Sequence, residues 1–110
     1  MGSKVLILGV TFKENCPDIR NSKVADVYYE LKEFGLQVDV YDYEANPQEV
    51  KHEYGIVLFD EINEKYEGIL LAVAHNKFLE LDIQSFKKDN ESVVFDLKGF
   101  LPRYLVNSRL

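Results

Sequence analysis

The hydrophobic and polar positions along the chain predict four short strands. Residues 5–8 form a continuous apolar run closed by Gly9, which is typical of a strand covered on both faces in a parallel sheet. Residues 37–42 alternate between apolar and polar side chains, whereas residues 69–74 and 93–95 are again apolar runs. The spacing between the first two strands suits a right-handed parallel crossover.

Helical patterns fill the gaps between these strands. Apolar residues at helical spacing predict a helix from residue 24 to residue 34, which Asn21 or Ser22 would cap and Gly35 would end. Asn46 and Gly55 are the corresponding signals for a shorter helix that begins at Pro47. Three further short helices or turns are expected, at residues 60–66, 76–79 and 82–88.

The alternation of strands and helices predicts a three-layer α/β/α sandwich with a mostly parallel, Rossmann-like sheet. We expect the strands to lie in the spatial order 2-1-3-4. Residues 4–110 are expected to form one domain, and residues 1–3 are interpreted as start or cloning residues. A chain of 110 residues leaves no room for a second catalytic domain.

Composition narrows the class of protein. The chain is 46% hydrophobic and 29% charged with only three prolines, which indicates a folded globular protein. Its net charge of -6 argues against broad binding to nucleic acid or anionic lipid, which needs a basic face. The apolar runs fall far short of the roughly 20 residues that span a membrane, and no leader precedes the first strand, so a cytoplasmic location is expected. The single cysteine, Cys16, has no disulfide or metal-ligand partner at a suitable spacing, so no metal site is expected.

The polar segments that follow the strands should gather at one edge of the sheet, where open parallel sheets bind ligands. The first of them, residues 9–22, is long for a strand-to-helix loop, where about two to six residues are common. It carries Lys13 and Arg20, whose cationic groups suit phosphate oxygens, and Phe12, whose ring could lie against a base or a sugar. Phe12 could equally be a core residue, with the two cations solvated. The GxGxxG fingerprint of ordinary NAD-binding domains is absent.

This loop also carries a family resemblance. The run GVTFKENCPDIRNSKVADV resembles the start of the carboxy-terminal, UDP-binding domain in the UDP-glucose/GDP-mannose dehydrogenase family. Members of that family share the pattern G-x-x-F-K-x-x-x-x-D-x-R-x-S, and every fixed position matches. The similarity continues through VDVYDYEANPQEV, LLAVAHNKF and VVFDLKGFLPR, so it covers essentially the whole chain in the order of the family.

The resemblance implies a parent enzyme that oxidises the 6-hydroxyl of a UDP-sugar to a carboxylate in two NAD-dependent steps, for polysaccharide precursor synthesis. Such enzymes combine an amino-terminal NAD domain and a central helical domain with this third domain, and the parent is expected to be a homo-oligomer. The catalytic nucleophile of the family is a cysteine in a Gly-Gly-x-Cys segment that this chain lacks. The chain alone is therefore expected to contain no catalytic residue and to be inactive.

The resemblance also implies a role for particular residues. Phe12 and Lys13 match positions that contact the UDP-sugar, and Lys13 is also expected near the reacting part of the substrate. Arg20 matches a residue that reaches the NAD phosphates across the domain cleft. Lys98 stands where the UDP-glucose-oxidising branch has an arginine, which resembles the branch that acts on UDP-N-acetylhexosamines or their uronate relatives. Arg103 is a weaker candidate, which could line the site or simply cap the chain end.

Several other polar residues have simpler interpretations. Cys16 lacks the sequence context of the family nucleophile and a nearby base, so an unreactive thiol is favoured. Asp42 ends a strand where a Rossmann domain would bind ribose, but without the glycine fingerprint turn capping is favoured. His75 borders the crevice and is expected to position the following turn by hydrogen bonding. His52 is expected to be solvated on a helix surface.

Two other classes of function stay open at this point. A non-catalytic flavodoxin-like interaction or regulatory domain would share the topology. A phospho-receiver would need an aspartate after the third strand, where this chain has His75, and a flavodoxin would need a hydroxyl-rich phosphate loop, where only Thr11 qualifies. The other class is a structural module that only completes a dimer.

Overall fold

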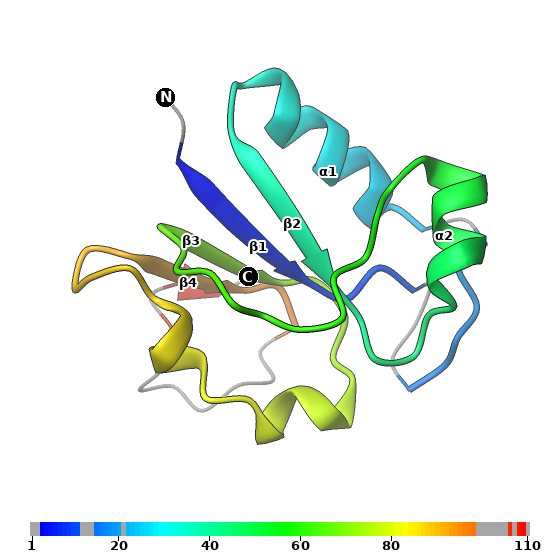
Figure 1. Ribbon diagram of the computed structural model, residues 1–110. Helices are drawn as coiled ribbons and strands as arrows, with labels where there is room; N and C mark the ends of the chain where they lie inside the picture. The colour runs from blue at the N-terminus through cyan, green and yellow to red at the C-terminus, as the bar shows by residue number, and fades with distance from the viewer. Residues whose placement is uncertain (1–2, 12–14, 21, 99–105, 107, 110) are drawn as a thin grey trace.

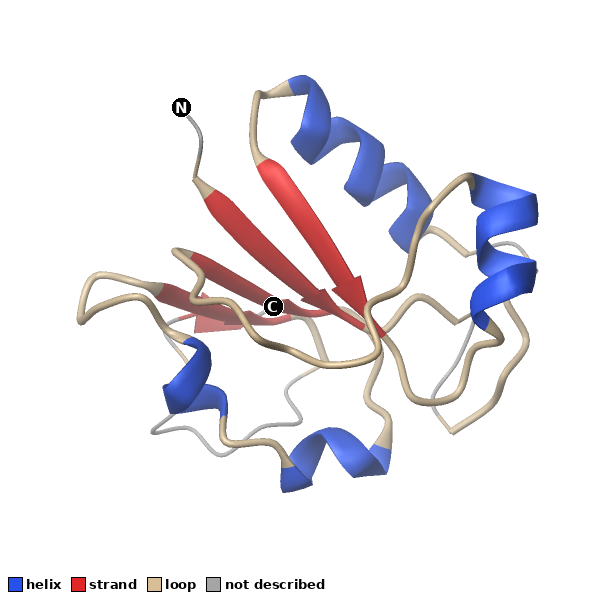
Figure 2. Cartoon of the chain, viewed as in Figure 1, coloured by secondary structure: helices blue, strands red, loops and turns tan. Residues whose placement is uncertain are grey.

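A parallel sheet of five strands, ordered β2-β1-β3-β4-β5, forms the centre of the computed structural model (Figures 1 and 2). The structure describes residues 3–11, 15–20, 22–98, 106 and 108–109. The strands are β1 Lys4–Leu8, β2 Gln37–Tyr41, β3 Gly68–Leu71, β4 Val93–Asp96 and β5 Ser108–Arg109. All neighbouring pairs are parallel, so the carboxyl ends of the strands meet at one edge.

The predicted α/β class and the order 2-1-3-4 are confirmed, and β5 adds a short edge strand that was not predicted. β5 has only two residues, whose backbones pair with Phe95 and Asp96, and so short and polar a segment carries no strand pattern. The third strand ends at Leu71, earlier than predicted. The next two backbone N–H groups, of Ala72 and Val73, both donate to the Leu8 carbonyl, which closes the ladder there.

Helices and loops cover both faces of the sheet. Helices α1 (Val24–Glu33) and α2 (Pro47–Tyr54) pack with Ile7 and Val40 in one buried cluster. The other face is covered by two 3-10 helices, η1 (Asn76–Glu80) and η2 (Ile83–Phe86), together with Tyr66. The predicted three layers are present, although one of them consists of single 3-10 turns (Figure 2).

One predicted helix is wrong and another is confirmed only in part. Residues 60–66 form bends instead of a helix, and the segment predicted as helical over residues 82–88 is helical only from Ile83 to Phe86. The cause is an isolated parallel bridge between Tyr66 and Lys87. The Tyr66 N–H donates to the Phe86 carbonyl, and the Tyr66 carbonyl accepts from Lys88. These bonds require an extended backbone at Tyr66 and Lys87, so neither segment can be helical at that end.

The start of α1 also differs from the prediction. The residue at its N-cap is Lys23, which makes no side-chain capping bond, and the Ser22 hydroxyl instead donates to the Val10 carbonyl at 2.6 Å. Asn21, the other predicted cap, lies outside the described residues. The predicted end is confirmed, because Gly35 follows the helix with a φ of 88° and its N–H donates to the Lys32 carbonyl.

The N-cap of α2 gives a first testable prediction. The Asn46 side chain accepts hydrogen bonds from the backbone N–H groups of Gln48 and Glu49, with Pro47 at the first helical position, as the sequence predicts. Asn46→Ala should lower the free energy of unfolding by about 1 kcal/mol, because both N–H groups lose this acceptor. Urea denaturation would measure the change, with Gln48→Ala as the control. Equal stability of Asn46→Ala and wild type would contradict the capping role.

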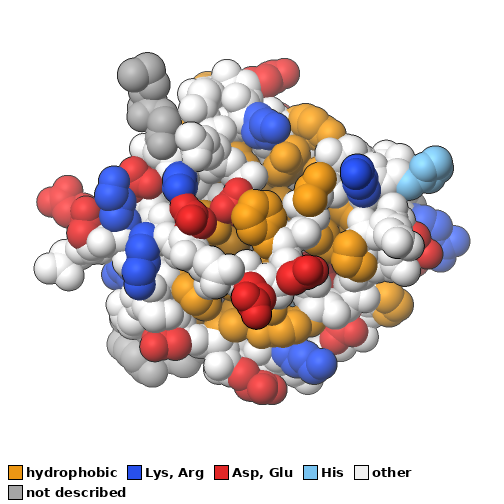
Figure 3. Space-filling model, in the orientation of Figure 1, with side chains coloured by type: hydrophobic (Ala, Val, Ile, Leu, Met, Phe, Trp, Pro, Cys, Tyr) orange, Lys and Arg blue, Asp and Glu red, His pale blue; other side chains and the backbone are white. Residues whose placement is uncertain are grey.

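Exposed apolar side chains gather on one face of the molecule. In Figure 3 they surround the segment that leads from α2 across the sheet to β3. Val57 and Phe59 in this segment are large exposed apolar residues, as are Tyr43 before α2 and Leu79 in η1. Within the part of the chain that the structure describes, no helix is long and apolar enough to cross a membrane.

Candidate functional site

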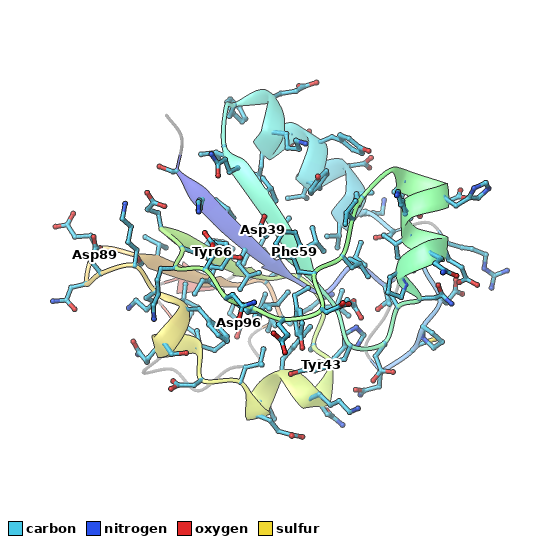
Figure 4. The ribbon with its side chains drawn as sticks, in the orientation of Figure 1. Asp39, Tyr43, Phe59, Tyr66, Asp89 and Asp96 are labelled. Atoms are coloured by element: carbon cyan, nitrogen blue, oxygen red, sulfur yellow. The ribbon has the colours of Figure 1, made fainter. Side chains whose placement is uncertain are left out.

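The site is built on the edge where the carboxyl ends of the strands meet. Residues 9–22 follow β1, residues 42–46 follow β2, residues 72–75 follow β3, and Leu97 and Lys98 follow β4. The sequence places polar residues in all of these segments, and the parallel ladders bring the segments together as predicted. Figure 4 labels Tyr43 and Asp96 at this end of β2 and β4.

Gly9 begins the long loop with a backbone that excludes a side chain. Its φ is 101°, in the region that favours glycine, and its N–H donates to the Tyr41 carbonyl at 2.9 Å. A Cβ atom at this position would lie 2.6 Å from the Cβ of Val73. The loops after β1 and β3 therefore pack so closely that only glycine fits between them.

Asp42 is the centre of a buried polar network at this edge. Its Oδ1 accepts from the backbone N–H groups of Glu44 at 2.7 Å and Ala45 at 3.0 Å. Its Oδ2 accepts from the Val10 N–H at 2.7 Å and lies 3.1 Å from Nε2 of His75. The prediction that Asp42 caps the turn after β2 is confirmed, and the same carboxylate also joins the loops after β1 and β3.

The carboxylate of Asp42 stays ionised in spite of its burial. Burial alone raises the pKa of a carboxyl, but the hydrogen bonds from His75 and from the backbone of Val10 and Ala45 outweigh it. Their sum holds the pKa of Asp42 below its usual value. The network thus contains one buried negative charge, which is stabilised by N–H donors from three loops.

His75 is fully buried and uses both ring nitrogens. Nδ1 accepts the backbone N–H of Asn15 at 2.8 Å, so Nδ1 carries no proton. The proton of the neutral ring therefore lies on Nε2, which is 3.1 Å from both Asp42 Oδ2 and Thr11 Oγ1. The His75 ring makes no capping bond to the turn that follows, where only its backbone carbonyl accepts the Phe78 N–H; the ring instead holds the loop after β1, so the predicted positioning role is confirmed for a different segment.

The second half of the long loop is tied to α2. The Tyr54 hydroxyl donates to the Ile19 carbonyl and accepts the Ser22 N–H at 3.2 Å. The Ser22 hydroxyl in turn bonds the Val10 carbonyl, close to the start of the loop. The described parts of the loop are thus held near its beginning, at Asn15 and near its end.

Arg20 is the predicted cofactor-binding residue that the structure describes. Its side chain is 84% exposed, and its Nε and Nη2 bond the two carboxylate oxygens of Asp18 at 3.0 and 2.9 Å. The hydrogen bonds and the charge of Asp18 raise the pKa of Arg20. Arg20 also lines a hollow of about 680 Å³, to which α2 contributes Glu49, His52 and Glu53.

The predicted substrate-binding residues are described only in part. Lys98 is exposed after β4, and its N–H donates to Oδ1 of the buried Asp96 at 2.9 Å. Lys98 follows β4, which is the second strand from β1 in the sheet, so the ends of β4 and β1 lie about 10 Å apart. Phe12, Lys13 and Arg103 lie outside the described residues.

Sequence reasoning missed how the polar residues combine. The sequence predicts separate turn roles for Asp42 and His75. It identifies Thr11 only as a hydroxyl group and assigns no role to Asn15. Asn15 has a φ of 57°, and asparagine is one of the few residues that adopt this conformation readily. An asparagine inside a long loop is the one sequence signal that could have marked this turn.

The fold and this edge define a class of protein, the doubly wound α/β domains that bind ligands beyond the carboxyl ends of a parallel sheet. Sequence comparison identifies the particular family. The sequence profile of the UDP-glucose/GDP-mannose dehydrogenase family, UDP binding domain, matches residues 6–103, and the chain belongs to this family. The family resemblance predicted from the loop motif is confirmed, and the flavodoxin-like alternative is not favoured.

Relatives with high identity cover nearly the whole chain. The chain is 45% identical over 113 residues to the UDP-N-acetyl-D-glucosamine 6-dehydrogenase of Salmonella typhi, covering 99% of this chain and 26% of that protein. It is 45% identical over 103 residues to the enzyme of the same name from Pseudomonas aeruginosa, covering 91% of this chain and 24% of that protein. The chain spans about a quarter of the length of these relatives.

Solved structures share the fold. A UDP-glucose dehydrogenase from the hyperthermophilic archaeon Pyrobaculum islandicum superposes with a TM-score of 0.77 at 24% identity, covering 98% of this chain and 24% of that chain. The native UDP-N-acetyl-mannosamine dehydrogenase Cap5O from Staphylococcus aureus gives a TM-score of 0.71 at 23% identity, covering 99% of this chain and 26% of that chain. These matches confirm the α/β fold.

Proposed function

We propose that this chain is the UDP-sugar-binding domain of an NAD-dependent dehydrogenase that oxidises the sugar 6-hydroxyl to a carboxylate. The observation that carries the proposal is the long loop after β1, whose sequence matches the family pattern at every fixed position. Described parts of this loop lie at the ligand edge of the sheet, held by the buried network of Asp42 and His75. The match of the family's UDP binding domain to residues 6–103 supports the same assignment.

The proposed roles follow the chemistry of each side chain. Phe12 would lie against the uridine or the sugar, and Lys13 would bind the UDP-sugar and also lie near its reacting part. Lys98 would meet the ligand from the end of β4, where its exposure leaves the ammonium group accessible. Arg103 is a weaker candidate for the same ligand. No residue of this chain is proposed as the nucleophile, which belongs to a cysteine segment elsewhere in the parent enzyme.

The sugar is proposed to be a UDP-N-acetylhexosamine or a related uronate. Lysine at position 98 supports this choice, because an ammonium group cannot reproduce the planar bidentate fork of arginine. Two relatives at 45% identity are named UDP-N-acetyl-D-glucosamine 6-dehydrogenase, which supports the same branch. A parent enzyme of this kind would supply an activated sugar acid to polysaccharide synthesis.

The cofactor is proposed to bind mainly outside this chain. NAD would accept the hydride, and Arg20 is the residue here that would contact its phosphates, because its guanidinium group is exposed. Residues 4–110 would form one domain that works in the cytoplasm with an amino-terminal NAD domain and a central helical domain, in a homo-oligomeric parent. The lack of the GxGxxG fingerprint argues against independent NAD binding by this domain.

Calorimetric titration with UDP and with a UDP-N-acetylhexosamine tests the proposal. We expect Lys13→Ala to weaken UDP binding by about 10- to 100-fold, because the phosphates lose a charge-assisted contact worth about 1.5–3 kcal/mol. Lys51→Ala, which removes an exposed lysine from α2, is the matched control and should bind as wild type does. The absence of UDP binding by the wild-type chain at millimolar ligand, or equal affinities of the two variants, would refute the proposal.

A further inference from the structure

One buried side chain holds the loop on both sides of residues 12–14. Thr11, the residue before this segment, places its hydroxyl 3.1 Å from Nε2 of His75. Asn15, the residue after it, donates its backbone N–H to Nδ1 of the same ring at 2.8 Å. His75 comes from a different loop, 60 or more positions away along the chain, and none of its surface is exposed.

A second contact strengthens the hold at Asn15. The Oδ1 atom of Asn15 accepts the backbone N–H of Asn76 at 2.8 Å, and Asn76 directly follows His75. Asn15 also has a φ of 57°, a left-handed conformation that asparagine adopts more readily than most residues. Two hydrogen bonds to consecutive residues hold this turn, so the position of the chain after residue 14 is set by the His75 loop.

The orientation of the ring is itself fixed. Nε2 faces Asp42, whose carboxylate is immobilised by three backbone N–H groups from two loops. The Phe78 ring packs at 5.3 Å between centroids from the turn that follows. Because Asp42 accepts the Nε2 proton, the ring keeps Nδ1 free to accept the Asn15 N–H. Asp42 therefore selects the tautomer that His75 needs in order to hold the loop.

We propose that His75 is a positioning residue of the UDP-sugar site, which fixes the two flanks of the Phe12-Lys13 segment before ligand arrives. This inference rests on the proposed function, in which Phe12 and Lys13 contact the ligand. A chain whose flanks are already fixed loses less conformational freedom on binding, so anchoring raises affinity without any contact between His75 and the ligand. A merely structural histidine would affect stability and leave affinity in the folded protein unchanged.

Two amide substitutions separate the two nitrogens. In His75→Asn the short amide can present an oxygen near the Nδ1 position and keep the Asn15 N–H bonded, while the contact with Asp42 is lost. In His75→Gln the longer amide reaches towards the Nε2 position and keeps the Asp42 contact, while the Asn15 N–H loses its acceptor. Both remove the imidazole, so both should lower stability, which urea denaturation would measure for each variant.

The readouts are UDP affinity by calorimetry and hydrogen exchange of the Asn15 amide. We expect His75→Gln to weaken UDP binding about tenfold or more and to speed Asn15 exchange, and His75→Asn to do both to a smaller extent. His52→Gln, the same substitution at an exposed histidine, should change neither. Equal UDP affinity of folded His75→Gln and wild type would overturn the proposal, as would losses that follow only the loss of stability.

Thr11→Val is a milder substitution that tests the proposal without removing the imidazole. Thr11→Val keeps the shape of a fully buried side chain and removes the hydroxyl that meets Nε2. It should weaken UDP binding by about two- to fivefold, and wild-type affinity in this folded variant would count against anchoring at Thr11. If the wild-type chain binds no UDP, the proposed function fails. Asn15 exchange then still decides the anchoring, because fast exchange in the wild type would contradict it and slow exchange that His75→Gln abolishes would support it.

Discussion

Replacing Gly9 with alanine is expected to lower the free energy of unfolding by about 3–5 kcal/mol. Its φ of 101° is strained for any residue with a Cβ atom, which contributes about 1–3 kcal/mol. The added methyl group would also lie 2.6 Å from the Val73 Cβ and 2.9 Å from the Val73 backbone nitrogen, so β1 and the loop after β3 would have to separate. Overpacking of this kind adds about 1–3 kcal/mol.

Gly35→Ala is the matched control for this prediction. Gly35 has a φ of 88°, but an added Cβ atom would meet nothing within 4 Å. It should therefore show the backbone strain alone, about 1–2 kcal/mol. Urea denaturation of both variants would separate the backbone strain from the overlap with Val73. Equal losses of stability would show that the overlap with Val73 does not destabilise the protein. A total stability of about 5–15 kcal/mol makes the Gly9 change a large one.

The parts of the fold that sequence predicts are those with strong local signals. The apolar run of β1 and the helical spacing of α1 identify both elements, and Gly35 marks the end of α1. The missing helix at residues 60–66 and the shortened one at residues 82–88 both end at one backbone bridge. Tyr66 pairs with Lys87 through backbone hydrogen bonds, and a pairing between segments 21 residues apart leaves no periodic pattern in either of them.

The sequence predicts where the candidate site lies, but it does not predict the hydrogen bonds that connect the residues of the site. Parallel topology places the loops after β1, β2 and β3 at one edge, which the order of elements already implies. The contacts of His75 with Asp42 and Thr11 join residues 33 and 64 positions apart. Each of these residues has an ordinary interpretation in its own loop, and only the three-dimensional structure shows that one imidazole serves all three loops.

The pair of Asp39 and Tyr66 shows the same limit away from the site. The Tyr66 hydroxyl donates to Asp39 Oδ2 at 2.6 Å across the face of β2, as the labelled side chains in Figure 4 illustrate. Burial, followed by this bond to an anion, raises the pKa of Tyr66. Tyr66 is the last residue of the helix predicted over residues 60–66, and the sequence gives no sign of its buried position, because its partner lies 27 residues earlier.

Asp42→Asn is expected to destabilise the protein by about 3–4 kcal/mol at pH 7, although the two side chains have nearly the same shape. If the amide oxygen accepts from Glu44 and Ala45, the amide NH₂ faces the Val10 N–H and the Nε2–H of His75. Each buried donor left without an acceptor contributes about 1–3 kcal/mol. His75 cannot relieve the clash by moving its proton to Nδ1, because the Asn15 N–H points at that nitrogen.

The difference in stability between Asp42→Asn and wild type should depend on pH. The pKa of Asp42 in the folded protein lies below that of the unfolded chain, so the ionised carboxylate stabilises the fold fully above about pH 5. This contribution is lost as the pH falls below about 4, through the folded pKa, and the stability gap should narrow there. Urea denaturation at pH 7, 5 and 3 would measure it, with the exposed Asp60→Asn expected to stay within about 0.5 kcal/mol of wild type at pH 7. A gap that stays constant or widens in acid would mean that the charge of Asp42 is not what the three loops hold in common. The network would then depend on the two acceptor oxygens of the side chain rather than on its charge.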